Sequence, residues 1–316
     1  METETQALAR VRADMVGLLL ELAPLEGYNL TPMADIRFLR SNRPLTRTPV
    51  LYEPGIVIVC QGRKRGYLGG TVYVYDAQHY LVVALPLPFS METDATEEEP
   101  LLAIYLRLDM SLAADVLTQI DERDGLVAVE PRGMATTRLD LALGESVLRF
   151  LRAIRNPLEA AILGPALVRE IYFRVFVGEQ GGSMRAALNR HGNFGRISKA
   201  LRKIHLRYAE ALSVEDLAAE AKMSVPSFHA HFKATTNTSP LQYIKSTRLH
   251  QARLLMARQG MTAAAASAQV GYESPSQFSR EFKRLFGGTP SEEIARMQRH
   301  FAVPEASLSS PFVSSH

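Results

Sequence analysis

A string of thirteen residues occurs twice in this chain, and the repeat restricts the fold more than any other feature of the sequence. The first copy, FHAHFKATTNTSP, spans residues 228–240, and the second, FSREFKRLFGGTP, spans residues 278–290. Both contain Phe-x-x-x-Phe-Lys, six variable residues and Pro, and each follows a short alanine-rich stretch with helical spacing. The sequence therefore predicts two copies of a helical unit that is longer than the string itself.

The first unit has the pattern of a helix-turn-helix motif. Ser213 is placed to cap a short helix, and Asp216, three residues later, is the short-carboxylate analogue of a capping box. A tight turn ends at Ser224, which is placed to cap the second helix. Phe228 and Phe232 stand at i and i+4 of that helix, so both are expected to face inward. Two short helices with a brief turn, the second exposing polar residues, are typical of helix-turn-helix geometry.

The second unit repeats this plan. Gly271 lies in its turn, Phe278 and Phe282 are expected to face inward, and Pro290 is expected to begin another helix. The turn is one residue longer, so the offset between the copies changes from 49 to 50 residues across it. A solenoid of stacked helix pairs is the alternative, but solenoids need at least about three repeats to bury a continuous core.

A single helix is predicted between the two units. It would begin at Pro240 and end at Gly260, which are favoured residues for the start and the end of a helix. Its apolar stripe is expected to consist of Leu241, Ile244, Ala252 and Leu255. Such a helix would hold the two units at a fixed separation.

Positive charge is concentrated around the repeat. Residues 196–303 contain sixteen Lys or Arg and eight Asp or Glu, a net charge of +8, whereas the whole chain carries +3, which leaves −5 for the remainder. This asymmetry is expected when the basic region binds a polyanion and the acidic region does not. A helical region whose charged side chains are simply solvated is the alternative explanation.

The pattern of apolar residues changes from strand-like to helical near residue 109. Residues 51–109 contain short β-branched or aromatic runs separated by Gly and Pro, which predict a sandwich or a barrel. Helical spacing follows in residues 111–122, 136–155 and 158–178, and it also occurs in residues 1–22.

The length of 316 residues and a hydrophobic content of 47% indicate two domains with their own cores. GEQGGS at 178–183 is expected to end a helix, and RHGNFGR at 190–196 to join the domains. Residues 301–316 are expected to be a disordered tail.

Several classes of protein lack support. Cys60 is the single cysteine, so an intramolecular disulfide framework and a cysteine-built zinc site are excluded, and we expect it to be a buried small hydrophobe rather than a redox sensor. The absence of a long apolar run and of a signal-peptide pattern favours a soluble cytoplasmic protein. The chain has no nucleophile elbow, phosphate-binding loop or dinucleotide fingerprint, so we expect no enzymatic activity and no cofactor.

Residues 197–300 closely resemble the DNA-binding domain of the AraC/XylS family of bacterial transcription regulators. The resemblance is carried by LAAEAKMSVPSFHAHFKATTNTSPLQYIKSTRLHQARLLM and AQVGYESPSQFSREFKRLFGGTP. It departs from the family pattern at Lys222 and Ala266, where a glycine and a larger aliphatic residue are usual, so the first helix of the second unit is expected to be thinly packed.

CQGRKRGYLGGTVYVYDAQHYLVVALPLPF and EEEPLLAIYLRLDM resemble the regulatory domain of one branch of that family. The resemblance implies an α+β chain: a cupin-like β-barrel with flanking helices, then an all-α domain of two helix-turn-helix units joined by a linker helix. The implied boundaries are 1–190 for the regulatory and dimerisation domain, with the barrel at about 30–110 and helices at about 110–178, and 197–300 for the DNA-binding domain, with units at about 213–239 and 262–289.

Matching positions to the family pattern implies roles for the outward residues of each second helix. The expected base contacts are Ser227, His229, Ser276, Gln277, Ser279 and Arg280. Arg pairs bidentately with guanine and Gln with adenine, so the second unit is chemically the better base reader. Lys233 and Lys283 are expected to contact phosphates, which position the protein without reading sequence.

An effector pocket is expected in the barrel, lined by Tyr67, Tyr75, His79 and Phe89, although alternate strand positions must point to opposite faces. His79 is the one histidine of the barrel region, so a cupin-type metal enzyme lacks ligands. His229 and His231 point about 200° apart on a helix and cannot chelate one ion together, so no metal is expected.

The expected partners are double-stranded DNA, RNA polymerase, a small-molecule effector and a second copy of the chain, with no membrane. Self-association is expected through the apolar stripes VLTQI and VLRFL between residues 110 and 176. Three hypotheses remain: an effector-controlled regulator, a regulator whose barrel serves only dimerisation and polymerase contact, and an enzyme with a DNA-binding domain attached.

Overall fold

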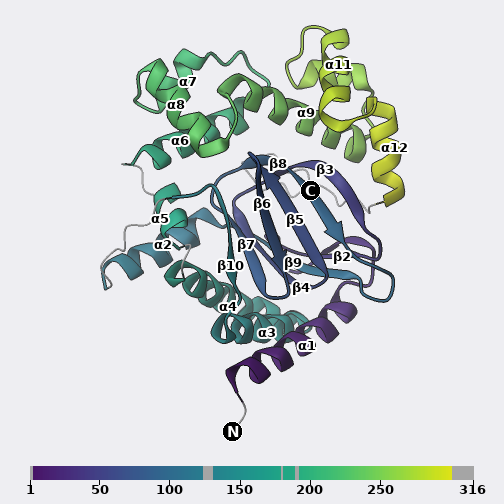
Figure 1. Ribbon diagram of the computed structural model, residues 1–316, viewed down its shortest axis with the longest axis vertical. Helices are drawn as coiled ribbons and strands as arrows, with labels where there is room; N and C mark the ends of the chain where they lie inside the picture. The colour runs from purple at the N-terminus through teal and green to yellow at the C-terminus, as the bar shows by residue number, and fades with distance from the viewer. Residues whose placement is uncertain (1–2, 124–130, 179–180, 189–191, 301–316) are drawn as a thin grey trace.

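The computed structural model describes residues 3–123, 131–178, 181–188 and 192–300. Within them an antiparallel sheet is flanked by helices, and a helical region that carries both copies of the repeat lies beyond one end of the sheet (Figure 1). This α+β arrangement confirms the fold predicted from the sequence. The disorder expected for residues 301–316 concerns a segment outside the described residues.

The strands of the described residues form one sheet. They are β1 (Gly27–Leu30), β2 (Ile36–Ser41), β3 (Leu45–Tyr52), β4 (Gly55–Gln61), β5 (Arg63–Leu68), β6 (Thr71–Asp76), β7 (His79–Val83), β8 (Leu87–Asp94), β9 (Leu101–Arg107) and β10 (Met134–Arg138). Their hydrogen-bonded order is β1-β2-β9-β4-β7-β6-β5-β8-β3, with β10 paired to β7, and the pairs are antiparallel. The side chains of β8 alternate between buried and half-buried, so one face of each such strand lines the interior of the curved sheet.

The sheet extends beyond the segment that the sequence predicted. It begins at Gly27, ahead of the strand-like runs at 51–109 but close to the start at about 30 that the family resemblance implied. β10 occupies a stretch where a helix was predicted from residue 136. Thr136 and Thr137 are β-branched and pair with β7, so strand pairing overrides the helical spacing there. The helix begins only after Asp140, whose side chain accepts a hydrogen bond from the Leu143 amide at 2.8 Å.

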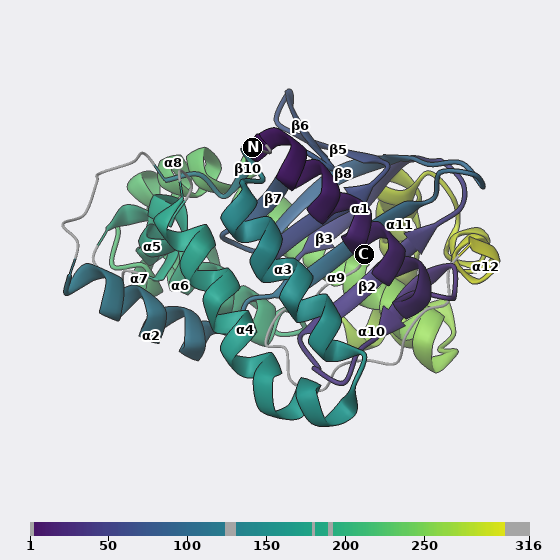
Figure 2. The ribbon, with the colours of Figure 1, turned by 90° about the horizontal axis from the view of Figure 1, so that it is seen from below.

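Five helices of the described residues flank the sheet. They are α1 (Glu4–Leu22), α2 (Met110–Asp121), α3 (Leu141–Ile154), α4 (Pro157–Val177) and α5 (Gly181–Leu188). α1 packs against α3, and α3 packs against α4, on one side of the sheet (Figure 2). α4 ends at Val177 with Gly178 as its C-cap, which confirms the predicted helix end at GEQGGS.

The apolar stripes expected to mediate self-association are buried within the chain itself. Val116, Leu117 and Ile120 of α2 are buried, and so are Val147, Leu148, Phe150 and Leu151 of α3. α2 packs against α4, and α3 packs between α1 and α4, so these two stripes are covered mainly by other helices of the same chain. The stripes were therefore wrong as the expected contact surface, whereas self-association through the helices between residues 110 and 176 stays a prediction. Large apolar side chains are instead exposed on α4, at Leu158, Ile162, Leu163, Phe173 and Val177.

The region after residue 191 is helical. Its helices are α6 (Asn193–Arg207), α7 (Val214–Glu220), α8 (Val225–Thr236), α9 (Pro240–Gln259), α10 (Ala263–Gln269), α11 (Pro275–Phe286) and α12 (Pro290–His300). The segment expected to join the domains thus has its last four residues in α6, while residues 190 and 191 lie outside the described part. No helix in the described ranges is long and apolar enough to span a membrane.

The predicted linker helix is present as α9, with Gly260 in the left-handed conformation at its end. Ile244, Ala252 and Leu255 are buried as expected, but Leu241 is 53% exposed, so that part of the predicted stripe was wrong. Leu241 lies in the first turn of α9, where the buried residues are Pro240, Tyr243 and Ile244.

Candidate DNA-binding interface

The first unit, α7 and α8, forms as its sequence predicted. The Ser213 hydroxyl accepts a hydrogen bond from the Asp216 amide at 3.0 Å and donates one to the Asp216 carboxylate at 2.6 Å. Phe228 and Phe232 are fully buried, and the Phe232 ring meets the Tyr243 ring of α9 edge to face, with 5.5 Å between the ring centroids. Aromatic packing therefore fixes α8 on the linker helix.

The two turns close with the same backbone hydrogen bond. In the first unit the Met223 amide donates to the Ala218 carbonyl at 2.9 Å, and in the second the Tyr272 amide donates to the Ser267 carbonyl at 3.0 Å. Lys222 and Gly271 are the corresponding residues, with φ of +53° and +82°. The usual glycine is therefore absent at a position where an L-residue is strained.

The second unit, α10 and α11, is built on smaller side chains in its first helix. Within α10 only Ala266 and Ser267 are buried, which agrees with the thin packing expected there. The second helix compensates with three stacked phenylalanines, because Phe278, Phe282 and Phe286 are all buried and their rings follow one another at 5.5 and 4.5 Å between centroids.

Arg248 of α9 joins the two units. Its guanidinium donates to the carbonyl oxygens of Tyr208 at 2.7 Å and Glu210 at 2.8 Å, in the loop before the first unit, and to that of Gly271 at 3.1 Å, in the turn of the second. Because one planar group is bonded at once to the loop that leads into the first unit and to the turn of the second, it restrains the position of one relative to the other. Sequence reasoning missed this residue, since a lone Arg on a predicted helix gives no sign of which distant carbonyls it will reach.

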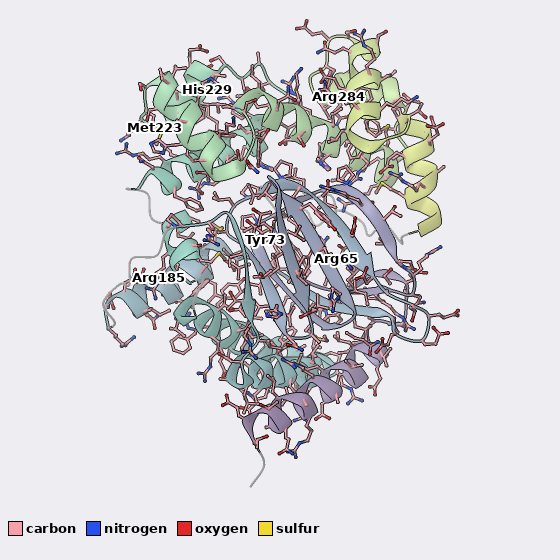
Figure 3. The ribbon with its side chains drawn as sticks, in the orientation of Figure 1. Arg65, Tyr73, Arg185, Met223, His229 and Arg284 are labelled. Carbon is pink, nitrogen blue, oxygen red and sulfur yellow. The ribbon has the colours of Figure 1, made fainter. Side chains whose placement is uncertain are left out.

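The residues expected to contact bases lie on the outer faces of α8 and α11. His229, Ser276, Gln277, Ser279 and Arg280 are exposed, and Ser227 is half-buried. Lys233 and Lys283 are also exposed. Figure 3 shows His229 on α8 and Arg284 on α11 at the side of the helical region that faces away from the sheet.

Hydrogen bonds already restrain two of these polar side chains. The Ser279 hydroxyl donates to the Pro275 carbonyl at 2.9 Å, so it is partly engaged by its own helix. Gln277 donates one of its two amide N–H groups to the Glu281 carboxylate at 3.2 Å. Its other N–H and its oxygen remain available to a base edge.

Glu281 is the centre of a small network that sequence reasoning did not identify. Its carboxylate accepts hydrogen bonds from Lys245 of α9 and from Tyr272, both at 2.7 Å, in addition to the one from Gln277. Burial alone would raise the pKa of Glu281, but these donors outweigh it and lower the pKa below its ordinary value. The carboxylate is therefore ionised and connects the outer face of α11 to the linker helix.

The helical region is docked on the sheet through α9. The Tyr243 hydroxyl donates to the Pro86 carbonyl at 2.7 Å, and the buried His205 ring nitrogen Nε2 lies 2.7 Å from the same hydroxyl. Burial lowers the pKa of His205 to about 3, so the ring is neutral and its Nε2–H donates to Tyr243. Leu254 of α9 also packs against Leu51 of β3.

The four residues expected to line an effector pocket do not meet. Tyr75 and Phe89 are buried on the inner face of the sheet. Tyr67 points outward, donates to the Glu92 carboxylate at 2.7 Å and is covered by the guanidinium of Arg47. His79 lies at the end of the β6–β7 turn, where its Nδ1 is 3.1 Å from the Asp76 carboxylate. The sequence pattern revealed the strands but not which alternate positions face inward.

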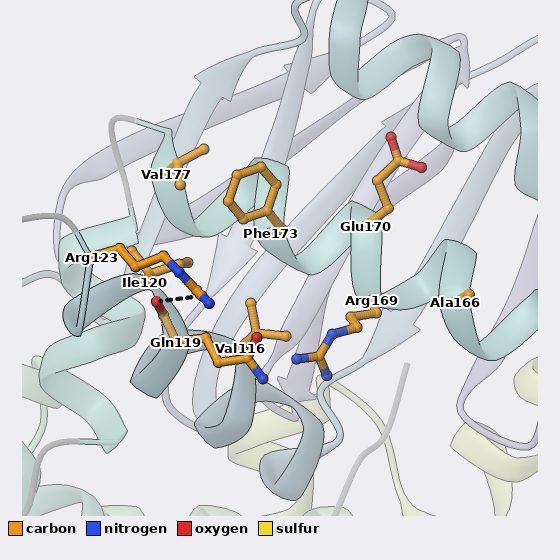
Figure 4. A pocket seen from close by; sticks show the side chains of 9 residues that line it. All are labelled: Val116, Gln119, Ile120, Arg123, Ala166, Arg169, Glu170, Phe173 and Val177. Atoms are coloured by element: carbon orange, nitrogen blue, oxygen red, sulfur yellow. Dashed lines mark hydrogen bonds between the residues drawn. The ribbon is translucent and has the colours of Figure 1, made fainter.

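A separate pocket of about 510 Å³ lies between α2 and α4 (Figure 4). Its apolar wall includes Val116, Ile120, Phe173 and Val177, and Arg123, Arg169 and Glu170 lie along it. The Arg123 guanidinium donates to the Gln119 carbonyl at 3.3 Å. Val116, Gln119 and Ile120 belong to the stripe VLTQI, which the sequence analysis assigned to self-association and not to a pocket. The lining residues of α4 were not singled out, because the pocket arises where two helices of different segments pack side by side.

Two protein families match this chain. The family described as AraC-type transcriptional regulator N-terminus matches residues 32–183, and the one described as Helix-turn-helix domain matches residues 217–296. The first match covers most of the sheet and the helices after it, and the second covers both units and the linker helix.

Curated relatives include HTH-type transcriptional regulators. Thermoregulatory protein LcrF of Yersinia pestis is 21% identical over 244 residues, which cover 76% of this chain and 88% of that protein. RclR of Escherichia coli, an RCS-specific HTH-type transcriptional activator, is 36% identical over 89 residues, 28% of this chain and 31% of that protein. YdeC of Bacillus subtilis, an uncharacterized HTH-type transcriptional regulator, is 32% identical over 95 residues, 30% of this chain and 33% of that protein. The chain thus matches about a third of the length of RclR and YdeC.

Solved structures of ToxT from Vibrio cholerae have a similar fold. One matches with a TM-score of 0.53 and 13% identity, covering 82% of this chain and 98% of ToxT. Another, with an unsaturated fatty acid bound, matches with a TM-score of 0.52 and 12% identity, covering 89% of this chain and all of ToxT. The sheet with its flanking helices and the helical region are therefore shared as one architecture.

Proposed function

Because this chain belongs to the AraC/XylS family of transcription regulators, we propose that it binds a specific DNA site through residues 197–300 under the control of a small molecule bound in the N-terminal domain. The observation that carries the proposal is that one guanidinium, that of Arg248, joins the loop leading into the first helix-turn-helix unit to the turn of the second, while the polar faces of α8 and α11 are exposed. Two units held in this way present two recognition helices to DNA together.

The proposed DNA contacts divide by chemistry. The outward polar residues of α8 and α11 read bases, with Arg280 and Gln277 able to make bidentate pairs. Lys233 and Lys283 neutralise phosphates and set the position of the protein on the duplex. Footprinting on a selected site tests the arrangement: protection of two successive major-groove segments, about 34 Å apart, supports it, and protection of one segment contradicts it.

The N-terminal domain, residues 1–190, is proposed to act as the effector-binding and dimerisation domain. Its sheet encloses a buried apolar interior that includes the aromatic residues Tyr52, Tyr75 and Phe89. ToxT, which has a similar fold, has been solved with a fatty acid bound, so a fold of this kind accommodates a small molecule. Effector binding is then a shift between arrangements of the two domains that differ in their competence for DNA.

Dimerisation is proposed to use the exposed face of α4. Leu158, Ile162, Phe173 and Val177 are all exposed and lie within about 100° of one another around the helix axis. In an antiparallel two-fold pair of α4 helices, Leu158 and Ile162 of one copy would enter the pocket beside Phe173 and Val177 of the other. Light scattering on Ile162→Glu, with Leu241→Glu as an exposed control outside this face, tests the interface: loss of dimer in the first variant alone supports it.

The second hypothesis, in which the N-terminal domain serves only dimerisation and contact with RNA polymerase, differs in one measurement. A compound that stabilises the chain and changes its affinity for the DNA site supports effector control. A compound that stabilises the chain and leaves DNA affinity, DNA geometry and transcription unchanged supports the second hypothesis. Both place the protein in the cytoplasm, where the DNA is.

A further inference from the structure

Lys64 lies in the interior of the sheet. It is on the inner face of β5 and is 1% exposed, whereas its neighbours Arg63 and Arg65 point outward and pair with acidic residues. No hydrogen bond or ion pair joins the Lys64 ammonium to another residue that the structure describes, and burial lowers its pKa to about 7. Buried lysines are rare unless they are paired, so this position is unusual for a structural residue.

Two hydroxyl groups flank Lys64 on the neighbouring strands. Tyr75 of β6 and Thr93 of β8 are paired with Lys64 in register from either side, and both are buried. Side chains of directly paired residues project from the same face, with β-carbons about 4.5–5.5 Å apart. The Thr93 hydroxyl has no hydrogen-bond partner among the described residues, and the Tyr75 hydroxyl faces that of Tyr52 without a hydrogen bond of standard geometry.

The rest of the surrounding surface is apolar. Phe89 and Met91 project from the same face of β8 as Thr93, and the Tyr52 ring packs against Phe89 with 4.8 Å between centroids. Figure 3 places Arg65 and Tyr73 on β5 and β6, the strands that carry Lys64 and Tyr75. One cationic side chain and two hydroxyl side chains therefore occupy neighbouring positions on the inner face of three adjacent strands, next to Tyr52, Phe89 and Met91.

An unpaired ammonium in such a place is costly, because it has lost its water without gaining an anion. A carboxylate removes that cost: one oxygen pairs with the ammonium, and the remaining lone pairs accept from the two hydroxyls. A neutral ligand such as a sugar would satisfy the hydroxyls but would leave the charge of Lys64 unpaired.

We propose that Lys64, Tyr75 and Thr93 form a subsite for the carboxylate of a small organic acid whose apolar part packs against Tyr52, Phe89 and Met91. The proposal rests on effector binding in the N-terminal domain and names the chemical class of that effector. The three polar residues bind the head of the ligand, and the aromatic residues select its body.

The test compares matched acids and amides on the full chain. Benzoate, phenylacetate and octanoate are paired with benzamide, phenylacetamide and octanamide, and the melting temperature is measured with each. At least one acid is expected to raise the melting temperature more than its amide does. Lys64→Met, which keeps the length of the side chain without the charge, should remove that difference, and Arg63→Met, on the outer face of the same strand, should keep it.

Proton uptake gives a second readout. At pH 8 the amine of Lys64 is largely neutral, and a bound carboxylate favours its protonated form. Calorimetry of the stabilising acid in two buffers of different ionisation enthalpy should therefore show uptake of up to about one proton per site in the parent chain and in Thr93→Val. It should show none in Lys64→Met.

The proposal is overturned if no acid exceeds its amide, or if Lys64→Met responds to acids as the parent chain does. It is also overturned if an aldehyde and borohydride add mass to Lys64 and that adduct alone changes DNA affinity, because the effector is then a carbonyl compound. If the aldehyde adduct changes DNA affinity, or if an amide binds and shifts DNA affinity, the carboxylate subsite is rejected but the proposal of effector control is retained. If none of the six compounds or the aldehyde binds, the carboxylate subsite is rejected, and if DNA affinity also proves insensitive to a broader metabolite screen, effector control is rejected with it.

Discussion

A β-carbon on Gly271 would lie 2.2 Å from the carbonyl oxygen of Ala209, so the turn of the second unit packs directly against the loop that precedes the first. Arg248 bonds to both sides of this contact, through the Gly271 carbonyl and the Tyr208 and Glu210 carbonyls. Gly271 is thus required twice, for its φ of +82° and for the approach of another backbone.

Gly271→Ala is therefore expected to destabilise the helical region by about 2–4 kcal/mol, because the new methyl group displaces the Ala209 backbone as well as straining the turn. Gly287→Ala is the matched control: its φ is +81° and nothing lies within 4 Å of its β-carbon position, so it bears the strain alone. We expect it to cost at most about 1 kcal/mol. Urea unfolding measures both, and equal losses would show that the contact with Ala209 contributes nothing.

Lys222 offers the opposite change. Its φ of +53° costs an L-residue about 1–2 kcal/mol, whereas glycine there would lose about 0.5–1 kcal/mol of backbone entropy. Lys222→Gly is thus expected to stabilise the chain by about 0.5–1 kcal/mol. Lys222→Ala removes the same charge without relieving the backbone and should give no such gain. A gain of the same size in both variants would assign the effect to charge.

The repeated string was sufficient to predict both units, because each carries its own cap, turn and inward phenylalanines within thirty residues. What joins the units was not predictable in this way. Arg248, Ala209 and Gly271 are brought together by folding over tens of residues, and no local pattern marks their contact. The roles of the outward residues remain a prediction carried by the family resemblance.

The sequence was sufficient to predict that the region of the sheet contains strands, but not which side chains of those strands are buried. Its aromatic runs predicted strands, but they did not show which of two alternating sets of side chains faces inward. In the structure Tyr75 and Phe89 face the interior, and Tyr67 faces outward. Lys64 was overlooked for the same reason, since a lysine between two arginines has the pattern of a solvated strand. The apolar stripes of α2 and α3 were assigned to the wrong contact. An apolar stripe predicts that a helix face is buried, but it does not show whether another helix of the same chain or a second copy buries it.

Lys64 should make stability depend on pH. Its pKa is lowered to about 7 in the folded chain, while an unfolded chain has the ordinary value of about 10.4. Between these values the unfolded chain binds a proton that the folded chain does not, so the free energy of unfolding rises with pH across this window. Lys64→Met is then expected to exceed the parent in melting temperature, most below pH 7, with a gap that narrows toward pH 10. A gap that is independent of pH would show that Lys64 is protonated in both states.

Glu281 is expected to act on DNA recognition through Gln277, which it holds by a hydrogen bond of 3.2 Å. Glu281→Ala frees the Gln277 amide and removes a negative charge near the proposed DNA contacts. Preference at the base pair that Gln277 is proposed to read should therefore fall, while non-specific affinity is unchanged or higher. Glu273→Ala removes an equal charge from the nearby turn, where Glu273 is exposed, and should leave that preference intact. Binding titrations on a site randomised at each position measure both quantities. Loss of affinity for all sequences alike in Glu281→Ala would indicate a structural role only.

Arg280 and Lys283 should differ in kind, although they are one turn apart and both exposed on α11. Arg280 stands among the outward residues that are proposed to contact base edges, so Arg280→Ala is expected to cost about 1–3 kcal/mol at the specific site and to relax preference at one or two base pairs. Lys283 is expected to neutralise a phosphate, so Lys283→Ala should weaken binding to every sequence and lower the salt slope by about 1. Titrations at several salt concentrations, on the specific site and on a randomised one, separate the two effects.

Arg284→Ala, on the same helix, serves as the control for a change in overall charge. Equal, sequence-independent losses for Arg280→Ala and Lys283→Ala would mean that Arg280 touches only the backbone, and base reading would then fall to α8 and to Gln277.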